Sequence, residues 1–257
     1  MSTLEKIGVI AWVAVRELLY ERVFYLLISF AAVALLLSAV LGQMTYADQQ
    51  KLTLDFMLAG IQLSMMLFSV FVGISLFQRE LMLGSVAMVL SKPVSRASFL
   101  IGKFLGQNLI QFAVTMAMTG ITLLLCLDYP KLNAWAVWEA GWLIFLELSV
   151  LSAVTYFFAV NASAITTAVA AVACFCLGHL REAISLNITP GTTPYHFWAA
   201  IKNVIPDFEI FNMKSLAAYG IALGVPELFW ASLYALLCLF FFLFLAAVSF
   251  QRKDILT

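Results

Sequence analysis

The sequence predicts an all-α integral membrane protein with about six transmembrane helices. Three observations indicate this fold class. Of the 257 residues, 64% are hydrophobic and only 11% are charged, whereas soluble domains are roughly half apolar and a quarter charged. The apolar residues gather in long runs, and Lys and Arg gather between alternate runs. No other segment is long enough for a soluble domain, so residues 1–257 are expected to form one transmembrane domain.

The individual spans follow from length, because a transmembrane helix needs about 20 mainly apolar residues. Six stretches meet this requirement: 24–42, 56–77, 99–127, 138–160, 162–180 and 228–250. The connections between them are short, except for residues 78–98 and 181–227.

Orientation follows from the basic residues, because cytoplasmic loops carry an excess of Lys and Arg. Most of them fall on one side of the spans: Lys6, Arg16, Arg22, Arg79, Lys92, Arg96, Lys103, Arg252 and Lys253. The opposite side receives Lys51, Lys131, Arg181, Lys202 and Lys214. The first side is therefore predicted to be cytoplasmic. An even number of spans places both termini there as well.

Residues 1–23 are predicted to form an N-terminal helix that lies in the membrane interface in contact with lipid. Its apolar stripe consists of Leu4, Ile7, Ala11, Val15 and Leu18. Such one-sided helices lie along bilayer surfaces. Val9, Ile10 and Val13 fall on the polar side, so packing against neighbouring helices is the alternative. No apolar core followed by a cleavage site is present, and a removable signal peptide is not expected.

Residues 181–227 are predicted to form an external cap of the re-entrant kind before the last span. The segment is too long for a turn, and its apolar patches at 197–201 and 216–225 are too short to cross a bilayer. Short apolar lengths are typical of re-entrant or interfacial helices. Irregular backbone at that depth must face protein or water, so the cap should be partly buried.

Residues 78–98 are predicted to form a cytoplasmic coupling segment. Residues 78–90 are compatible with a short amphipathic helix. Pro93 then ends it, because Pro lacks an N–H and keeps Lys92 out of helical geometry. A helix followed by a break in a basic cytoplasmic loop suits the transmission of a partner's motion into the spans. The alternative is a loop with ordinary positive-inside residues.

The pattern R-E-x-x-x-G-S-x-x-x-x-L-S-K-P-V-S-R-x-x-F-x-x-G-K in this region resembles the coupling segment of type-2 ABC transporter permeases. The positions that carry the resemblance are Glu80, Gly84, Pro93, Arg96, Gly102 and Lys103. The six-span plan, the N-terminal helix, the long last external connection and the basic tail at 251–254 are similar too. Ile205–Glu209 resembles the Pro-centred segment of permeases grouped with multicopper-enzyme maturation.

The resemblance implies the permease subunit of an exporter in the bacterial cytoplasmic (inner) membrane, acting as a homodimer with separate ATP-binding cassette ATPase subunits. It implies ATPase-coupling roles for Arg79, Glu80, Gly84, Lys92, Pro93, Arg96 and Lys103. Glu80 and Arg96 would fix the segment, and Gly84 and Pro93 would shape it. ATP and magnesium would bind the partner, and this chain is expected to hold no cofactor. The external cap is a candidate docking site for a periplasmic partner.

Several other functions find no support in the sequence. Gly102-Lys103 lacks the Gly-rich loop and following Ser/Thr of a Walker A motif, so this chain is not expected to be an enzyme that hydrolyses ATP. A formal net charge of zero gives no support to nucleic-acid binding. The cysteines lie in apolar runs as small hydrophobes. Of the soft ligands, only Cys176 and His179 have a spacing that shares a helix face, and no metal site is predicted.

Glu147 is the candidate residue of a translocation path, because it lies midway along the predicted span 138–160. An ionisable group at that depth is expensive and usually faces a cavity or a partner. It can be a cargo-path or proton-linked residue. It can equally be a carboxyl that is protonated, or that is hydrogen-bonded to a neighbouring helix as structural support. The sequence indicates no intramembrane base as its partner.

Two alternative functions stay open at this point. An ATP-independent secondary transporter or channel would need more intramembrane charge and helices broken at the midplane. A non-transporting membrane anchor driven by the same kind of ATPase would have the same sequence features as an exporter.

Overall fold

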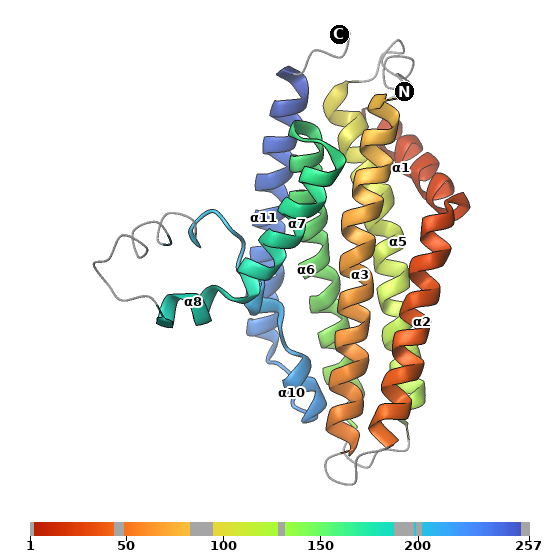
Figure 1. Ribbon diagram of the computed structural model, residues 1–257, viewed down its shortest axis with the longest axis vertical. Coiled ribbons are helices and arrows are strands. Elements are labelled where there is room, and N and C mark those ends of the chain that lie inside the picture. Colours follow the sequence, from red (N-terminus) through yellow and green to blue (C-terminus); the bar gives the residue numbers. More distant parts are fainter. Residues whose placement is uncertain are drawn as a thin grey trace.

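The computed structural model describes residues 3–43, 49–82, 95–127, 132–187, 198 and 202–252. Within these ranges the chain is helical and contains no strand, so the predicted all-α class is confirmed. Figure 1 shows a bundle of long helices that run nearly side by side. The start of α1 and the end of α11 lie at the same end of this bundle.

The long helices agree with the predicted spans in position. They are α2 (Arg22–Gln43), α3 (Gln49–Met82), α5 (Arg96–Leu125), α6 (Ala134–Asn161) and α11 (Val225–Arg252). Among the described residues, four helices are long and apolar enough to cross a membrane: Lys51–Gln78, Arg96–Leu125, Ala134–Asn161 and Val225–Arg252. By length and composition, the described residues therefore offer four helices that could cross a membrane, or five if a bent helix pair is counted as one span. Helix α2 is 22 residues long and mainly apolar, and six spans stay a prediction.

The bent pair consists of α7 (Ala164–His179) and α8 (Arg181–Asn187), which meet at an angle of 64°. In Figure 1, α7 ends partway along the bundle and α8 turns sideways. The predicted span 162–180 therefore exists as a helix, but it passes the length criterion only together with α8.

Helix α6 forms the centre of the bundle. In its most apolar stretch 83% of the residues are buried, compared with 22% in α11. Helices α3, α5, α7 and α11 all pack on α6. Side-chain caps fix where the helices begin: Asn133 accepts from the backbone of Trp135 before α6, and Ser95 accepts from the Ser98 N–H before α5.

The described part of the predicted cap packs on the side of the bundle. It contains the short helices η1 (Glu209–Phe211) and α10 (Lys214–Ala218), which contact α6, and α10 also contacts α3. Phe208 and Phe211 are fully buried there. A Cβ at Gly178 would lie 2.3 Å from Phe208 Cδ2, so this glycine lets the segment seat directly against α7.

Helix α1 (Thr3–Tyr20) packs tightly on α5. Two glycines of α5 leave room for it, as at close helix crossings in membranes: Gly102 lies against the Ile10 side chain and Gly106 against the Ala11 backbone. Ala14, Val15 and Leu18 of α1 are buried. The face of α1 that bears Ala14, Val15 and Leu18 therefore packs against neighbouring helices, as the alternative prediction had it. On the opposite face Val9, Trp12, Val13, Leu19 and Tyr20 are exposed and remain available to lipid.

We predict that Gly106→Ala destabilises the protein by about 1–3 kcal/mol, as overpacking does. The new Cβ would lie 2.6 Å from the Ala11 carbonyl oxygen and 2.7 Å from Ala14 Cβ, so α1 must move. Gly8→Ala is the matched control, since a Cβ there meets nothing within 4 Å. Thermal unfolding in detergent micelles measures both variants. Equal melting temperatures would show that α1 is not seated on these glycines.

Candidate functional site

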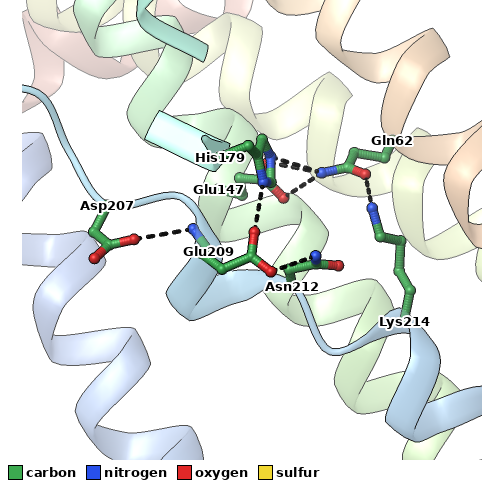
Figure 2. A network of polar contacts seen from close by, with 7 residues as sticks. All are labelled: Gln62, Glu147, His179, Asp207, Glu209, Asn212 and Lys214. Atoms are coloured by element: carbon green, nitrogen blue, oxygen red, sulfur yellow. Dashed lines mark hydrogen bonds and ion pairs between the residues drawn. The ribbon is translucent and has the colours of Figure 1, made fainter. Parts of the chain in front are cut away.

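Polar side chains from five elements meet beside the end of α7 (Figure 2). Gln62 comes from α3, Glu147 from α6, His179 from the last turn of α7, Glu209 from η1 and Lys214 from α10. The last turn of α7 brings His179 to this place, and the chain bends away directly after it into α8. We call these five residues the polar cluster.

Glu147 is the most deeply buried member, with none of its surface exposed. Gln62 Nε2 donates to both carboxylate oxygens, at 2.8 and 2.9 Å. His179 Nε2 lies 2.7 Å from Glu147 Oε1. The expectation that Glu147 has no intramembrane base as its partner is therefore wrong. The base is His179, which is 32 residues away in sequence and belongs to the neighbouring broken helix.

The His179 ring bridges the bundle and the cap. Its second nitrogen, Nδ1, lies 3.2 Å from Glu209 Oε2. The ring packs edge-on against Phe175, with 4.7 Å between ring centroids, and also faces Phe208. These aromatic contacts fix the ring plane, so both nitrogens point at carboxylates.

Lys214 closes the cluster on the side of α3. Its ammonium group donates to Gln62 Oε1, which leaves the Gln62 amide nitrogen directed at Glu147 (Figure 2). Burial lowers the pKa of Lys214, and the nearby carboxylates of Glu147, Glu209 and Asp55 act in the opposite direction. Lys214 is half-buried, so the nearby carboxylates offset part of the cost of enclosing its charge.

A second group of contacts holds η1 in place at the rim of the cluster. Arg181 Nη1 lies 3.4 Å from Asp207 Oδ2, and Asp207 Oδ1 accepts the Glu209 N–H at 3.2 Å. Asn212 Nδ2 donates to Glu209 Oε1 at 2.8 Å. The hydroxyl of Tyr234, on α11, accepts the Asp207 N–H at 2.8 Å. Glu209 is therefore positioned by its neighbours before it meets His179.

The cluster suits charge and proton handling better than metal binding. Over the ranges that the structure describes, no group of three or more His, Cys, Asp and Glu side chains could hold a metal ion. Cys176 is exposed on α7, and His179 is directed at two carboxylates instead. What the geometry offers is an imidazole held between two carboxylates, one of them buried and the other partly exposed.

Polar side chains also occupy the core between α3, α5 and α6. Gln107 Nε2 donates to the Ser69 carbonyl at 3.1 Å and lies 3.3 Å from Ser152 Oγ. Gln111 Oε1 accepts from the Ser69 and Ser152 hydroxyls, each at 3.1 Å. All four side chains are fully buried. The predictions missed this group, although the signal was present: Gln107, Gln111 and the buried Thr115 recur every four residues along one span.

The predicted coupling residues are described only in part. Arg79 and Glu80 belong to the last turns of α3, but their side chains lie outside the described part of the structure. Gly84, Lys92 and Pro93 fall between the described ranges 49–82 and 95–127. Their predicted roles stay predictions.

The two other coupling residues contact helices at the ends of the chain. Arg96 Nη1 donates to the carbonyls of Phe250 and Gln251, at 3.1 and 3.3 Å, near the end of α11. Lys103 Nζ lies 2.5 Å from Glu17 Oε2 on α1. Lys103 is only 2% exposed, so it reaches α1 and not a soluble surface. The sequence showed the charge of Lys103, but it did not indicate that Glu17 is its partner or that Lys103 is buried.

We predict that Glu147 and His179 are energetically coupled. In a double-mutant cycle with Glu147→Gln and His179→Gln, the interaction energy should be roughly 1–3 kcal/mol, as for contacting buried polar groups. Unfolding by a denaturing detergent, titrated into micelles, gives the four stabilities.

Glu182→Gln serves as the control for this cycle. It changes an exposed carboxyl on α8, and its effect should add to that of Glu147→Gln. Additive effects of Glu147→Gln and His179→Gln would contradict the contact.

Comparison with known proteins gives no family assignment. No family model matches the chain, and no curated protein matches it significantly. The resemblance of residues 78–103 to type-2 permeases therefore stays a prediction, and a function has to be argued from the residues and their geometry.

Proposed function

We propose that this chain is the membrane subunit of an ATP-driven exporter of the type-2 ABC permease kind. In this proposal two copies form a homodimer with the cargo path between them, and separate ATPase subunits bind residues 78–98 on the cytoplasmic side of a bacterial inner membrane. The observation that carries the proposal is how residues on both sides of this segment are anchored.

The anchors reach three different parts of the bundle. Gln78, at the start of the segment, donates to the Ala162 carbonyl at 2.9 Å and lies 3.3 Å from Thr167 Oγ1, so it holds the turn between α6 and α7. Arg96 holds the end of α11, and Lys103 holds α1. A partner that moved residues 78–98 would therefore move the ends of several helices together.

Helix α3 can carry such a movement to the polar cluster. It is one continuous helix from Gln49 to Met82, and it bears Gln78 at one end and Gln62 nearer the other. Gln62 bonds to Glu147, and Gln78 bonds to the start of α7, the helix that ends at His179. This connection supports a coupling role for residues 78–98. A displacement of these residues would move α3 as one rigid helix and would therefore change the contact of Gln62 with Glu147.

An ATP-independent transporter or channel is the second candidate. It is favoured by the bend between α7 and α8 and by the buried charges at that bend, since transporters place binding sites where helices are interrupted. A non-transporting anchor with the same ATPase would share the coupling contacts and would differ only in moving no cargo.

The proposal predicts that the solubilised chain co-purifies from its native membrane with a stoichiometric ATP-binding subunit. Deletion of residues 78–98 should abolish this recovery. Glu80→Arg and Arg96→Glu should each lower the ATP hydrolysis of the recovered complex, since both residues would fix the coupling segment. Lys202→Glu is the matched control, because it changes a charge on the external segment that an ATPase cannot reach.

The outcomes separate the candidates. Recovery of the chain alone, with no nucleotide hydrolysis, would overturn the ATP-driven proposal in favour of the second candidate. Full hydrolysis by both charge-swap variants would contradict the roles of Glu80 and Arg96. Hydrolysis without any ATP-dependent export from intact cells or vesicles would indicate the anchor.

A further inference from the structure

The His179 ring contacts a carboxylate with each of its nitrogens, at 2.7 Å from Nε2 to Glu147 and at 3.2 Å from Nδ1 to Glu209. Contacts of this length are hydrogen bonds and need a hydrogen between the two atoms. A neutral imidazole has one N–H. With both carboxylates ionised, one ring nitrogen would then present its lone pair to an anionic oxygen. The two contacts therefore require one proton more than the neutral ring supplies.

The position of this proton follows from Gln62. The Gln62 amide donates to both oxygens of Glu147, and its own carbonyl accepts from Lys214. Both oxygens of Glu147 thus already accept hydrogen bonds from Gln62. The additional proton is then placed on the ring or between the ring and Glu209.

The surrounding charges favour the same proton. The charged and titratable groups that face the cluster are Lys51 and Asp55 on α3, Glu147 on α6, Arg181 on α8, Asp207, Glu209 on η1, Lys214 on α10, and Tyr234 and Cys238 on α11. Lys51, Arg181 and Lys214 carry three positive charges, whereas Asp55, Glu147, Asp207 and Glu209 carry four negative ones. One proton on His179 therefore makes the set neutral. Neutrality matters because unbalanced charge is costly in a bilayer.

The exposure of the side chains indicates which of the two His179 contacts, to Glu147 or to Glu209, is lost when the proton is released. The side chain of Glu147 is 1% exposed, that of His179 is 19% exposed and that of Glu209 is 43% exposed. The contact to Glu209 is also the longer one. The Glu209 contact is therefore the less enclosed of the two, and loss of the proton breaks this contact between η1 and His179.

We propose that Glu147, His179 and Glu209 form a binding site for one exchangeable proton, and that this proton strengthens the attachment of η1 to the bundle. Release of the proton removes the contact of Glu209 with His179 and loosens the segment from Pro206 to Lys214, which then depends on its remaining contacts. This inference goes beyond the proposed function, because it needs no ATPase and applies to the chain by itself.

The test uses the full chain in lipid nanodiscs with ¹⁵N-labelled histidine. The sequence has two histidines, so His196→Gln leaves the ring signals of His179 alone. We expect a doubly protonated ring at neutral pH that loses one proton as the pH rises. Hydrogen exchange of peptides covering 205–219, corrected for the intrinsic rate at each pH, should accelerate in the same pH range.

Variants assign the proton to the cluster. Glu147→Gln removes the buried negative charge and should move both transitions to lower pH. Glu209→Gln should make the hydrogen exchange of residues 205–219 independent of the protonation of the His179 ring. Because the Glu209 side chain is more exposed, this variant can be used if Glu147→Gln does not fold. Glu227→Gln, on an exposed residue of α11, should change neither transition.

The proposal is overturned if the ring is singly protonated while residues 205–219 are still protected. It is also overturned if exchange of that segment is independent of the ring's protonation. Neither readout depends on a nucleotide-binding partner, so this test can fail while the proposed function holds, and the reverse.

Discussion

A carboxylate buried inside a membrane bundle must have partners, and the arrangement of this protein around Glu147 follows from that constraint. Gln62 and His179 supply hydrogen bonds from two different helices. His179 reaches Glu147 from the last turn of α7, directly before the bend to α8. Gly178 leaves room for Phe208, which packs against α7 and brings Glu209 to the far side of the ring. The segment that contains η1 is therefore docked on the same ring that contacts the buried acid.

The two ends of the bundle are connected through helices that are continuous between them. Gln78 and Gln62 lie on the same helix, and each contacts a part of the α6–α7 hairpin. Closely packed helices have low compressibility, so a displacement of one helix is transmitted to its neighbours. Between these two contacts, buried Ser69, Gln107 and Ser152 add hydrogen bonds that lock α3, α5 and α6 together. A force applied at residues 78–98 and a charge change at His179 thus act on the same hairpin from opposite ends.

Much of the fold could be predicted from the sequence, because apolar run length determines where membrane helices lie. Glu147 could be identified by the same logic, as the one carboxyl at the middle of a predicted span. Its partners could not, because Gln62, His179 and Lys214 are far from it in sequence and come together only through the bend after α7. Nothing in the composition of residues 162–180 marks that bend. Lys103 could be placed near the cytoplasmic side by its charge, but its burial depends on Glu17 and on two glycines that let α1 approach.

The central claim is that His179 contacts Glu147 inside the bundle, and a direct measurement of that contact in a bilayer tests it best. Solid-state NMR can report dipolar coupling between ¹⁵N in the histidine ring and ¹³C in glutamate side-chain carboxyls, in a His196→Gln background. The account predicts strong coupling to Nε2, consistent with the 2.7 Å Nε2–Oε1 distance, and its loss in Glu147→Gln. Coupling at Nε2 that is absent, or that is unchanged by Glu147→Gln, would contradict the account.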